Sequence, residues 1–219
     1  MGLLFKYIIF VLIEVFILQL ATFIKNKTND NELSRKCTHI GCLSTTFIIP
    51  YLLFKNTPHF FISICIFVII DIIMTFVDGL LPQIERENSE ENNKKSSILE
   101  GLAMIPLSIL AYMNPEWMLP CGIGFITLAF GDGFAALIGV KYGKYSIKLK
   151  NKKSLIGSLG FILFALMGMI VIHLLLGEPI YIGMLLLISI ISSIIELYSG
   201  DYDNFLIPIT SAILTFILL

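Results

Sequence analysis

The sequence predicts an all-α integral membrane protein, a polytopic helical bundle with about eight transmembrane helices. Hydrophobic residues make up 57% of the 219 residues and charged residues only 14%, whereas soluble domains are about 45–50% apolar. The mean hydropathy is +0.89. Apolar runs near the roughly 20 residues that cross a bilayer recur along the whole chain. We therefore expect a single transmembrane domain, 1–219.

The apolar runs define the expected spans: 3–24, 37–54, 60–81, 97–113, 117–140, 154–176, 179–198 and 204–219. The first run lacks a small-residue cleavage site, so we expect a spanning helix and not a removed signal. The fifth contains Pro120, and two glycines flank Asp132. Seven spans plus a broken or re-entrant fifth helix is therefore the alternative. The four cysteines form no CxxC pair and are expected to fill the core.

Lysine and arginine residues are distributed unevenly between the two sides of the expected bundle. Of these 15 residues, 13 follow the first, third and fifth spans, and only Lys6 and Lys55 lie on the other side. The positive-inside rule places the richer side in the cytoplasm. The expected cytoplasmic loops are about 25–36, 82–96, 141–153 and 199–203. In a prokaryote the protein would lie in the cell membrane with its site facing the cytoplasm, and the net charge of -1 indicates no nucleic-acid partner.

One stretch, 131–157, combines the residue types that a bound polyphosphate needs. Asp132 lies between two glycines in an apolar run, and six lysines follow within 141–153. Phosphate oxygens take cationic side chains and free backbone N–H groups, and a carboxylate holds the divalent metal ion that accompanies a triphosphate. The alternative interpretation is a membrane helix followed by an ordinary basic cytoplasmic loop.

Small residues in this stretch have two interpretations. Gly139 and Gly143 follow the carboxylate at helical spacing and give a groove of small residues. Close packing of two membrane helices explains the same glycines, although it does not explain the carboxylate. Lys153, Ser154 and Gly157 lie at the start of the sixth span, where unpaired N–H groups favour an anion. The pattern is not a Walker-type loop.

The segment 32–41, ELSRKCTHIG, places polar residues on one helical stripe. Four of them follow the spacing i, i+3, i+4 and i+7: Glu32, Arg35, Lys36 and His39. An arginine beside a lysine suits phosphate oxygens. His39, one turn deeper, is placed to contact a phosphate or the hydroxyl of an acceptor. The alternative is a juxtamembrane basic cluster that binds anionic lipid headgroups.

Three further acidic residues inside the expected spans are candidates for a functional role. Asp71 and Asp78 are seven residues apart in the third span and share a helix face, while Glu14 lies in the first span. A carboxylate at membrane depth is costly and usually faces a polar interior or a pathway. Asp78, near the cytoplasmic end, is a candidate site residue. For Asp71 and Glu14, a buried structural hydrogen bond is the alternative.

The turn before the last span concentrates oxygen ligands. Glu196 ends the seventh span, and Asp203 and Asn204 follow closely. Hard oxygen ligands suit Mg²⁺, which would bridge carboxylates to phosphates. The alternative is an Asx turn that caps the last helix. The expected metal ligands are Asp132, Glu196, Asp203 and Asn204.

The order of these motifs resembles that of a known enzyme family. The chain carries ELSRKCTHIG near its start, then GDGFAALIGVKYG leading to KKSLIGS, and ELYSGDYDNFLIP near its end. Together they look like the motifs of the CTP-dependent lipid-alcohol kinases, the dolichol, phytol and polyprenol kinase family. That family is distantly related to the phosphatidate cytidylyltransferases. The likeness covers most of the chain.

The resemblance implies a membrane kinase that transfers the terminal phosphoryl group of CTP to the hydroxyl of a long-chain lipid alcohol, with Mg²⁺. The residues that match the family's motifs are Arg35, Lys36, His39, Asp132, Ala135, Gly139, Gly143, Lys153, Ser154, Gly157, Glu196, Asp203, Asn204 and Pro208. We expect catalysis from His39, Asp132 and Glu196. We expect nucleotide or phosphate binding from Arg35, Lys36, Gly139, Gly143, Lys153, Ser154 and Gly157. The expected partners are the lipid alcohol, CTP and membrane lipids.

Two other functions stay open. A cytidylyltransferase would use CTP to form a CDP-lipid, although the glycine-rich ending with an Asp-Arg pair that is typical of those enzymes is missing. A small transporter would use Asp71, Asp132 and Glu196 as an ion path, although no pair of inverted halves is visible. The chain is short for the eukaryotic dolichol branch, so a shorter prenol, phytol or diacylglycerol stays open as the acceptor. The residues alone identify neither the acceptor nor the oligomeric state, and CTP over ATP rests on the resemblance.

Overall fold

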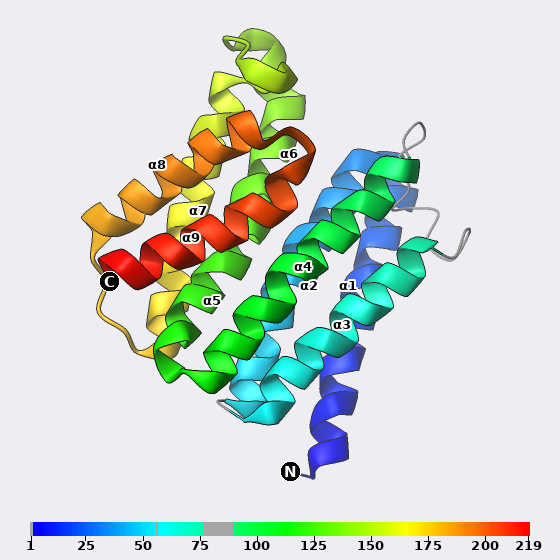
Figure 1. Ribbon diagram of the computed structural model, residues 1–219. Coiled ribbons are helices and arrows are strands. Elements are labelled where there is room, and N and C mark those ends of the chain that lie inside the picture. The colour runs from blue at the N-terminus through cyan, green and yellow to red at the C-terminus, as the bar shows by residue number, and fades with distance from the viewer. Residues whose placement is uncertain (1, 56, 77–89) are drawn as a thin grey trace.

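The computed structural model describes residues 2–55, 57–76 and 90–219, which form helices joined by turns (Figure 1). The helical elements that build the bundle are α1 (Leu3–Thr28), α2 (Asn31–Phe54), α3 (Pro58–Phe76), α4 (Glu90–Met113), α5 (Met118–Ile126), the π-helical segment η2 (Thr127–Asp132), α6 (Gly133–Tyr142), α7 (Leu155–Leu176), α8 (Ile182–Ser199) and α9 (Asp203–Leu218). These ranges contain no strand. The all-α fold predicted from the sequence is confirmed.

Seven helical stretches in the described part are long and apolar enough to cross a membrane. The last of them, Ile182–Leu218, comprises α8, the short turn η5 (Gly200–Tyr202) and α9. These two helices fold back against each other (Figure 1). The protein is therefore a polytopic helical membrane protein, as predicted, and the two final expected spans correspond to this hairpin.

The fifth expected span is the central helix of the bundle. In an apolar stretch of 18 residues of this helix, 61% of the residues are buried, compared with 17% in α1. α5, η2 and α6 follow one another without a break, so the alternative of a helix broken at Asp132 is wrong. A π-helical turn is wider than an α-helical turn and is often found at functional sites. Here it accommodates the glycines while the backbone stays helical, and Gly131 packs directly against the ring of Phe161.

The connection between α1 and α2 is much shorter than the predicted loop 25–36. Asn29 adopts a left-handed backbone conformation, with φ 53°, at the end of α1. The side chain of Asp30 then accepts a hydrogen bond from the backbone N–H of Leu33, 2.9 Å away, and caps α2. Because this cap starts the helix early, only Asn29 and Asp30 lie outside the two helices.

The other three expected loops differ in structure. The loop 141–153 contains the short 3₁₀ turns η3 (Gly143–Tyr145) and η4 (Lys150–Lys152), and Lys148 forms an isolated β-bridge with Ser154. The loop 199–203 corresponds to η5. Within 82–96, the structure describes residues from Glu90 onward, and these belong to α4.

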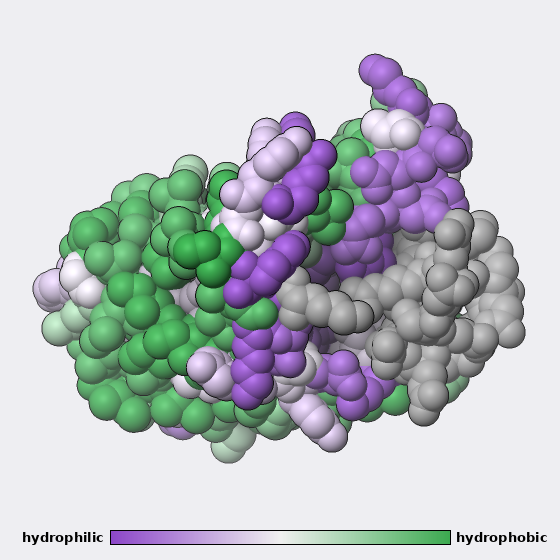
Figure 2. Space-filling model, turned by 90° about the horizontal axis from the view of Figure 1, so that it is seen from above, coloured by the Kyte–Doolittle hydropathy of each residue, from purple (hydrophilic) through white to green (hydrophobic). Residues whose placement is uncertain are grey.

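The α1–α2 turn, the start of α4, the α6–α7 connection and the α8–α9 turn lie toward the same end of the bundle, at the top of Figure 1. An ion pair joins two of these parts, because Lys95 Nζ of α4 lies 3.3 Å from Asp201 Oδ2 of η5. Figure 2 shows hydrophilic residues gathered across this end, beside hydrophobic surface. This is the end that the charge distribution predicts to be cytoplasmic, and that orientation stays a prediction.

Candidate active site

A polar cavity of about 400 Å³ opens at this end of the bundle. The starts of α2 and α4, the π-helical segment, the α6–α7 connection and the α8–α9 turn all contribute to it. Its lining residues are Arg35, Lys36, His39, Lys95, Ser96, Asp132, Asn151, Lys153, Gly200, Asp201, Asp203 and Asn204. All three sequence motifs therefore meet in one cavity.

Lys36 and Asp132 form a buried ion pair between α2 and the π-helical segment. Lys36 Nζ donates to Asp132 Oδ2 at 2.5 Å, and the two side chains are only 6% and 11% exposed. Removing two charges from water costs free energy, and close contact between them is needed to offset that cost. The pair therefore fixes the position of both groups at the cavity wall.

Lys153 forms a second cluster with two carboxylates. Its Nζ lies 2.8 Å from Glu196 Oε1 and 3.6 Å from Asp203 Oδ2, and it also donates to the backbone carbonyl of Glu196 at 2.8 Å. Burial lowers the pKa of Lys153, but the surrounding carboxylates, chiefly those of Glu196 and Asp132, outweigh burial and hold the pKa above its usual range. The side chain is therefore a permanent cation at neutral pH.

His39 lies between two acidic residues. Its Nε2 is 3.5 Å from Asp132 Oδ2, and its Nδ1 is 3.9 Å from Glu100 Oε2. Both distances exceed those of normal hydrogen bonds, and Nε2 has no hydrogen-bond partner among the described residues. His39 therefore has one buried ring nitrogen that lacks a hydrogen-bond partner, and such a nitrogen can accept a proton.

The α8–α9 turn is tied to the start of α4. The amide of Asn204 donates to the hydroxyl of Ser96. Lys95 Nζ, which pairs with Asp201, also lies 4.4 Å from the centre of the Tyr202 ring. In addition, Asp203 Oδ1 accepts a hydrogen bond from the backbone N–H of Asn204 at 2.9 Å. These contacts fix the α8–α9 turn at the edge of the cavity. The hydrogen bond within the turn also stabilises the start of α9.

Arg35 lines the cavity, and its guanidinium group is paired with a carboxylate of the same helix. The Nη2 and Nε atoms donate to the two carboxylate oxygens of Glu32 at 2.6 and 3.2 Å. This bidentate pair confirms the helical i, i+3 spacing that the sequence predicted. A phosphate at this position would share the guanidinium with Glu32 or replace it.

Four residues that we expected to bind phosphate lie at a helix contact and not among the residues that line the described cavity: Gly139, Gly143, Ser154 and Gly157. Ser154 caps α7, because its Oγ accepts a hydrogen bond from the backbone N–H of Gly157 at 3.3 Å. A Cβ at Gly157 would lie 3.1 Å from the carbonyl oxygen of Ala135, and one at Gly143 only 2.9 Å from Ser154 Oγ. The geometry is therefore that of close α6–α7 packing, and direct phosphate binding by these residues stays a prediction.

The expected metal ligands are drawn together without forming a dedicated metal cage. Asp132, Asp203 and Asn204 line the cavity, and Glu196 is linked to it through Lys153. Within the described ranges, no group of three or more His, Cys, Asp or Glu side chains is placed to hold a metal ion. Nucleotide-bound Mg²⁺ usually takes one or two carboxylates plus phosphate oxygens. The donor set therefore fits a metal ion that arrives with a nucleotide.

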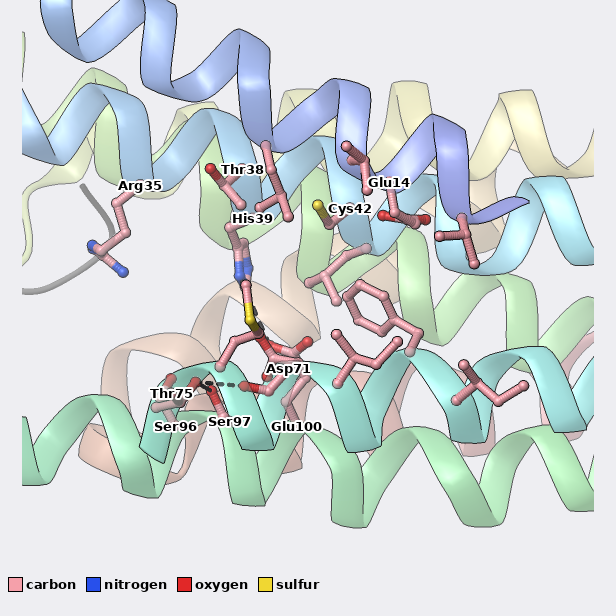
Figure 3. A pocket seen from close by; sticks show the side chains of 18 of the residues that line it. Glu14, Arg35, Thr38, His39, Cys42, Asp71, Thr75, Ser96, Ser97 and Glu100 are labelled. Atoms are coloured by element: carbon pink, nitrogen blue, oxygen red, sulfur yellow. Dashed lines mark hydrogen bonds and ion pairs between the residues drawn. The ribbon is translucent and has the colours of Figure 1, made fainter. Parts of the chain in front are cut away.

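A second pocket, of about 280 Å³, lies between α1 and α3 and is lined also by α2 and α4 (Figure 3). It contains Glu14 and Asp71, two of the three acidic residues noted in the spans. The third, Asp78, lies outside the described residues. Its polar lining also includes Glu100, which sequence reasoning missed. Because Glu100 is a single carboxylate inside an apolar span, the sequence did contain a signal that could have identified it.

Three further cavity residues lie outside the predicted motifs and were missed by sequence reasoning: Lys95, Ser96 and Asn151. They occur in polar segments, where nothing in the sequence separates a site residue from a solvated one. Asn151 has a left-handed backbone, with φ 55°, and its amide donates to the carbonyl of Leu197 at 2.9 Å. It therefore joins the lysine-rich connection to the end of α8.

Comparisons with curated proteins find distant relatives. The chain is 29% identical over 162 residues to a probable phytol kinase 1, chloroplastic, of Glycine max, which is 67% of this chain and 51% of that protein. It is 24% identical over 209 residues to a probable phytol kinase, chloroplastic, of Zea mays, with 86% of this chain and 67% of that protein covered. The matched region thus spans about half of the first relative's length and two thirds of the second's.

A bacterial relative has a similar length. The chain is 27% identical over 209 residues to an uncharacterized protein of Rickettsia prowazekii, and the match covers 87% of this chain and 96% of that protein. No family model matches the chain, and no solved structure matches it. The chain is therefore similar, at low identity and over most of its length, to plant proteins named probable phytol kinase.

Proposed function

We propose that this protein is a membrane kinase that transfers the terminal phosphoryl group of CTP to the hydroxyl of a long-chain lipid alcohol of the polyprenol, dolichol or phytol type. The observation that carries the proposal is the convergence of Lys36, Lys153 and Asp132 in one cavity beside His39. The relatives named probable phytol kinase support a kinase that acts on a lipid alcohol. CTP as the donor follows from the resemblance of the motifs, and a cytoplasmic site follows from the charge distribution.

The mixture of charges in the cavity favours a metal-nucleotide complex over a free triphosphate. Four lysine or arginine side chains and three carboxylates line it. Carboxylates repel a free triphosphate, whereas a divalent ion joins carboxylate to phosphate oxygens. Asp132, with Glu196 or Asp203 and the amide oxygen of Asn204, would hold Mg²⁺. When bound, this ion supplies charge neutralisation at the phosphates.

Lys36, Lys153 and Arg35 would neutralise the remaining phosphate charge. Each is paired with a carboxylate in the structure. A nucleotide bound with its metal ion would let these cations exchange carboxylate partners for phosphate oxygens, while the ion would pair with the released carboxylates of Asp132 and Glu196. Phosphoryl transfer depends mainly on positioning and electrostatic stabilisation, so preplaced cations are the main contribution that this chain can make.

His39 is the base in this proposal. It accepts the hydroxyl proton while the alcohol oxygen bonds to the terminal phosphorus. The bond between that phosphorus and the bridging oxygen breaks, and CDP leaves with the electron pair. The imidazolium formed would lie beside Asp132, whose Oδ2 is 3.5 Å from Nε2. The products are a lipid phosphate, CDP and a proton.

The test is to incubate purified protein in detergent with Mg²⁺, four nucleoside triphosphates and a panel of lipid alcohols, and to follow lipid phosphate. Label from the γ-position of CTP should enter the lipid. Label from the α-position would instead indicate a CDP-lipid product and would contradict the kinase. Solute uptake by vesicles that lack CTP and lipid alcohol, if abolished by Asp132→Asn, would favour a transporter.

A further inference from the structure

The pocket between α1 and α3 has an apolar side and a polar side (Figure 3). Val11 of α1 and Ile70 of α3 belong to the apolar side. His39, Asp71 and Glu100 belong to the polar side, and Glu14 lies apart from them, beside apolar side chains (Figure 3). The pocket therefore matches a molecule with a long apolar body and one hydrogen-bonding end.

The polar side adjoins the cavity that we assign to the nucleotide. Arg35, His39 and Ser96 line both spaces. His39 faces Glu100 in one space through Nδ1 and Asp132 in the other through Nε2, at 3.9 and 3.5 Å. The two pockets therefore meet at His39, where a hydroxyl group from one and a phosphate from the other come within reach of the same ring.

Glu14 gives the pocket a hydrogen-bond acceptor that the protein itself does not use. Its Oε1 accepts a hydrogen bond from the hydroxyl of Thr45 at 2.8 Å. Its Oε2 is buried and has no partner among the described residues. A buried polar atom without a partner is costly. An occupant that donates a hydrogen bond, as a hydroxyl group does, would remove that cost.

The apolar side opens sideways toward the lipid. Val11 and Ile70 line the pocket and are nevertheless 41% and 45% exposed. α1 packs mainly against α2, and α3 packs against α2 and α4, so the space between α1 and α3 lies at the edge of the bundle (Figure 1). An apolar chain can therefore enter from the bilayer without crossing water.

Building on the proposed kinase function, we propose that this pocket takes the acceptor directly from the bilayer between α1 and α3, and that it selects a neutral lipid alcohol over an anionic lipid. Among its described lining residues, Arg35 is the one lysine or arginine, and its Nη2 is already 2.6 Å from Glu32. The carboxyl groups of Glu14, Asp71 and Glu100 supply no positive charge to a phosphate, whether or not they are protonated. They accept a hydrogen bond from a hydroxyl group readily.

This selection has a consequence for the reaction. Phosphorylation converts the neutral occupant into an anion, for which the polar side of the pocket offers no cation other than the paired Arg35. The product is therefore expected to leave toward the bilayer surface instead of returning to the pocket. The same argument disfavours phosphatidate, the lipid that a cytidylyltransferase would need.

The first test is photolabelling of the full chain in lipid nanodiscs, without nucleotide, by an isoprenoid alcohol that carries a diazirine in its tail. Label is expected on α1 and α3. An unlabelled isoprenoid alcohol should compete for labelling, and phosphatidate should not. Equal competition by phosphatidate, or label confined to α7 and α8, would overturn the proposal.

The second test fills the pocket. Val11→Trp and Ile70→Trp add bulk inside it, whereas Leu12→Trp and Ile73→Trp add the same bulk on the same helices at positions that are 60% and 53% exposed and do not line it. The first pair should raise the KM for the alcohol by about tenfold or more and leave the KM for the nucleotide unchanged. The second pair should behave as wild type. Equal effects from both pairs would overturn the proposal.

The two proposals fail in different ways. If wild-type protein phosphorylates lipid alcohols but the pocket variants match their controls, the kinase stands and the acceptor pocket is wrong. If no nucleotide yields lipid phosphate, the kinase is wrong. The labelling pattern and its competition still decide whether the pocket binds a neutral alcohol, because they need no turnover.

Discussion

The polar cavity and the α1–α3 pocket share His39 but differ in the groups that contact their acidic side chains. In the cavity, Asp132 and Asp201 each have a lysine Nζ within 3.3 Å, and Glu196, beside the cavity, has Lys153 Nζ at 2.8 Å. In the pocket, Glu14 is hydrogen-bonded to a threonine, and Glu100 has His39 at 3.9 Å. Paired charges of both signs prepare a site for an anion that brings its own metal ion. Acids without a lysine suit a neutral donor, so the comparison distinguishes the proposed nucleotide site from the proposed alcohol site.

The largest expected effect comes from removing the carboxylate of the buried pair. Asp132→Asn should lower kcat about a thousandfold and should also destabilise the fold by about 3–5 kcal/mol, because Lys36 is left as an uncompensated buried charge. The double variant Lys36→Met/Asp132→Asn removes that charge and should recover stability without recovering activity. Lipid phosphate formation and thermal unfolding measure the two effects.

The control for this experiment is Glu116→Gln, which removes an exposed carboxylate in the short turn η1 (Pro115–Trp117), away from the cavity. It should change neither activity nor stability appreciably. Recovery of activity in the double variant would show that Asp132 only compensates the charge of Lys36. That result would contradict the catalytic role that we assign to Asp132.

Substitution of His39 tests the point where the two spaces meet. His39→Gln should lower kcat by about 10²–10⁴ and leave nucleotide binding unchanged, because we assign the phosphate contacts to other residues. The matched control is His59→Gln, since His59 is hydrogen-bonded to Tyr7 at 3.0 Å and lies outside both pockets. Weaker nucleotide binding with unchanged kcat would assign His39 to the nucleotide instead of the alcohol.

Lys153→Met is expected to act on the nucleotide. Loss of one hydrogen bond to a charged group should raise the KM for nucleotide about 10- to 100-fold. Because the pKa of Lys153 is raised, the charged form persists through neutral pH, and wild-type binding should not weaken until the pH exceeds the ordinary range of lysine. Lys144→Met, at an exposed position in the same connection, is the control.

A titration of nucleotide affinity between neutral and mildly alkaline pH measures the second part of this prediction. A loss of affinity in wild type that disappears in Lys153→Met would mean that the lysine deprotonates in this range. That result would contradict the described carboxylate cluster.

The smallest effect is expected at the exposed edge of the cavity. Asp201→Asn breaks the ion pair between Asp201 and Lys95. The side chains of these two residues are 67% and 38% exposed, respectively. Exposed pairs contribute about 0.2–1 kcal/mol, so thermal unfolding should change little. A destabilisation as large as that of Asp132→Asn would show that burial does not separate the two pairs as we describe.

The sequence could predict the helical fold and much of the cavity. Apolar run lengths gave the spans, and helical spacing placed Arg35, Lys36 and His39 on one stripe of α2. Wrong details arose where local signals were ambiguous. The polar residues 25–36 suggested a loop, but the cap at Asp30 places most of them in helices. The glycines around Asp132 suggested a break, but a π-helical turn and packing against Phe161 keep the chain helical.

By itself the sequence determined that this is a helical membrane protein with its cationic residues concentrated on one side. Hydropathy is a local quantity, and it depends on neither the partners nor the order of the helices. Tertiary structure alone decided which charges meet: Lys36 with Asp132, 96 residues away, and Lys153 with Glu196. It also separated the acids of the α1–α3 pocket from the lysines. Helical spacing fixes which residues share a face, but the partner of that face depends on how small and large side chains pack between helices.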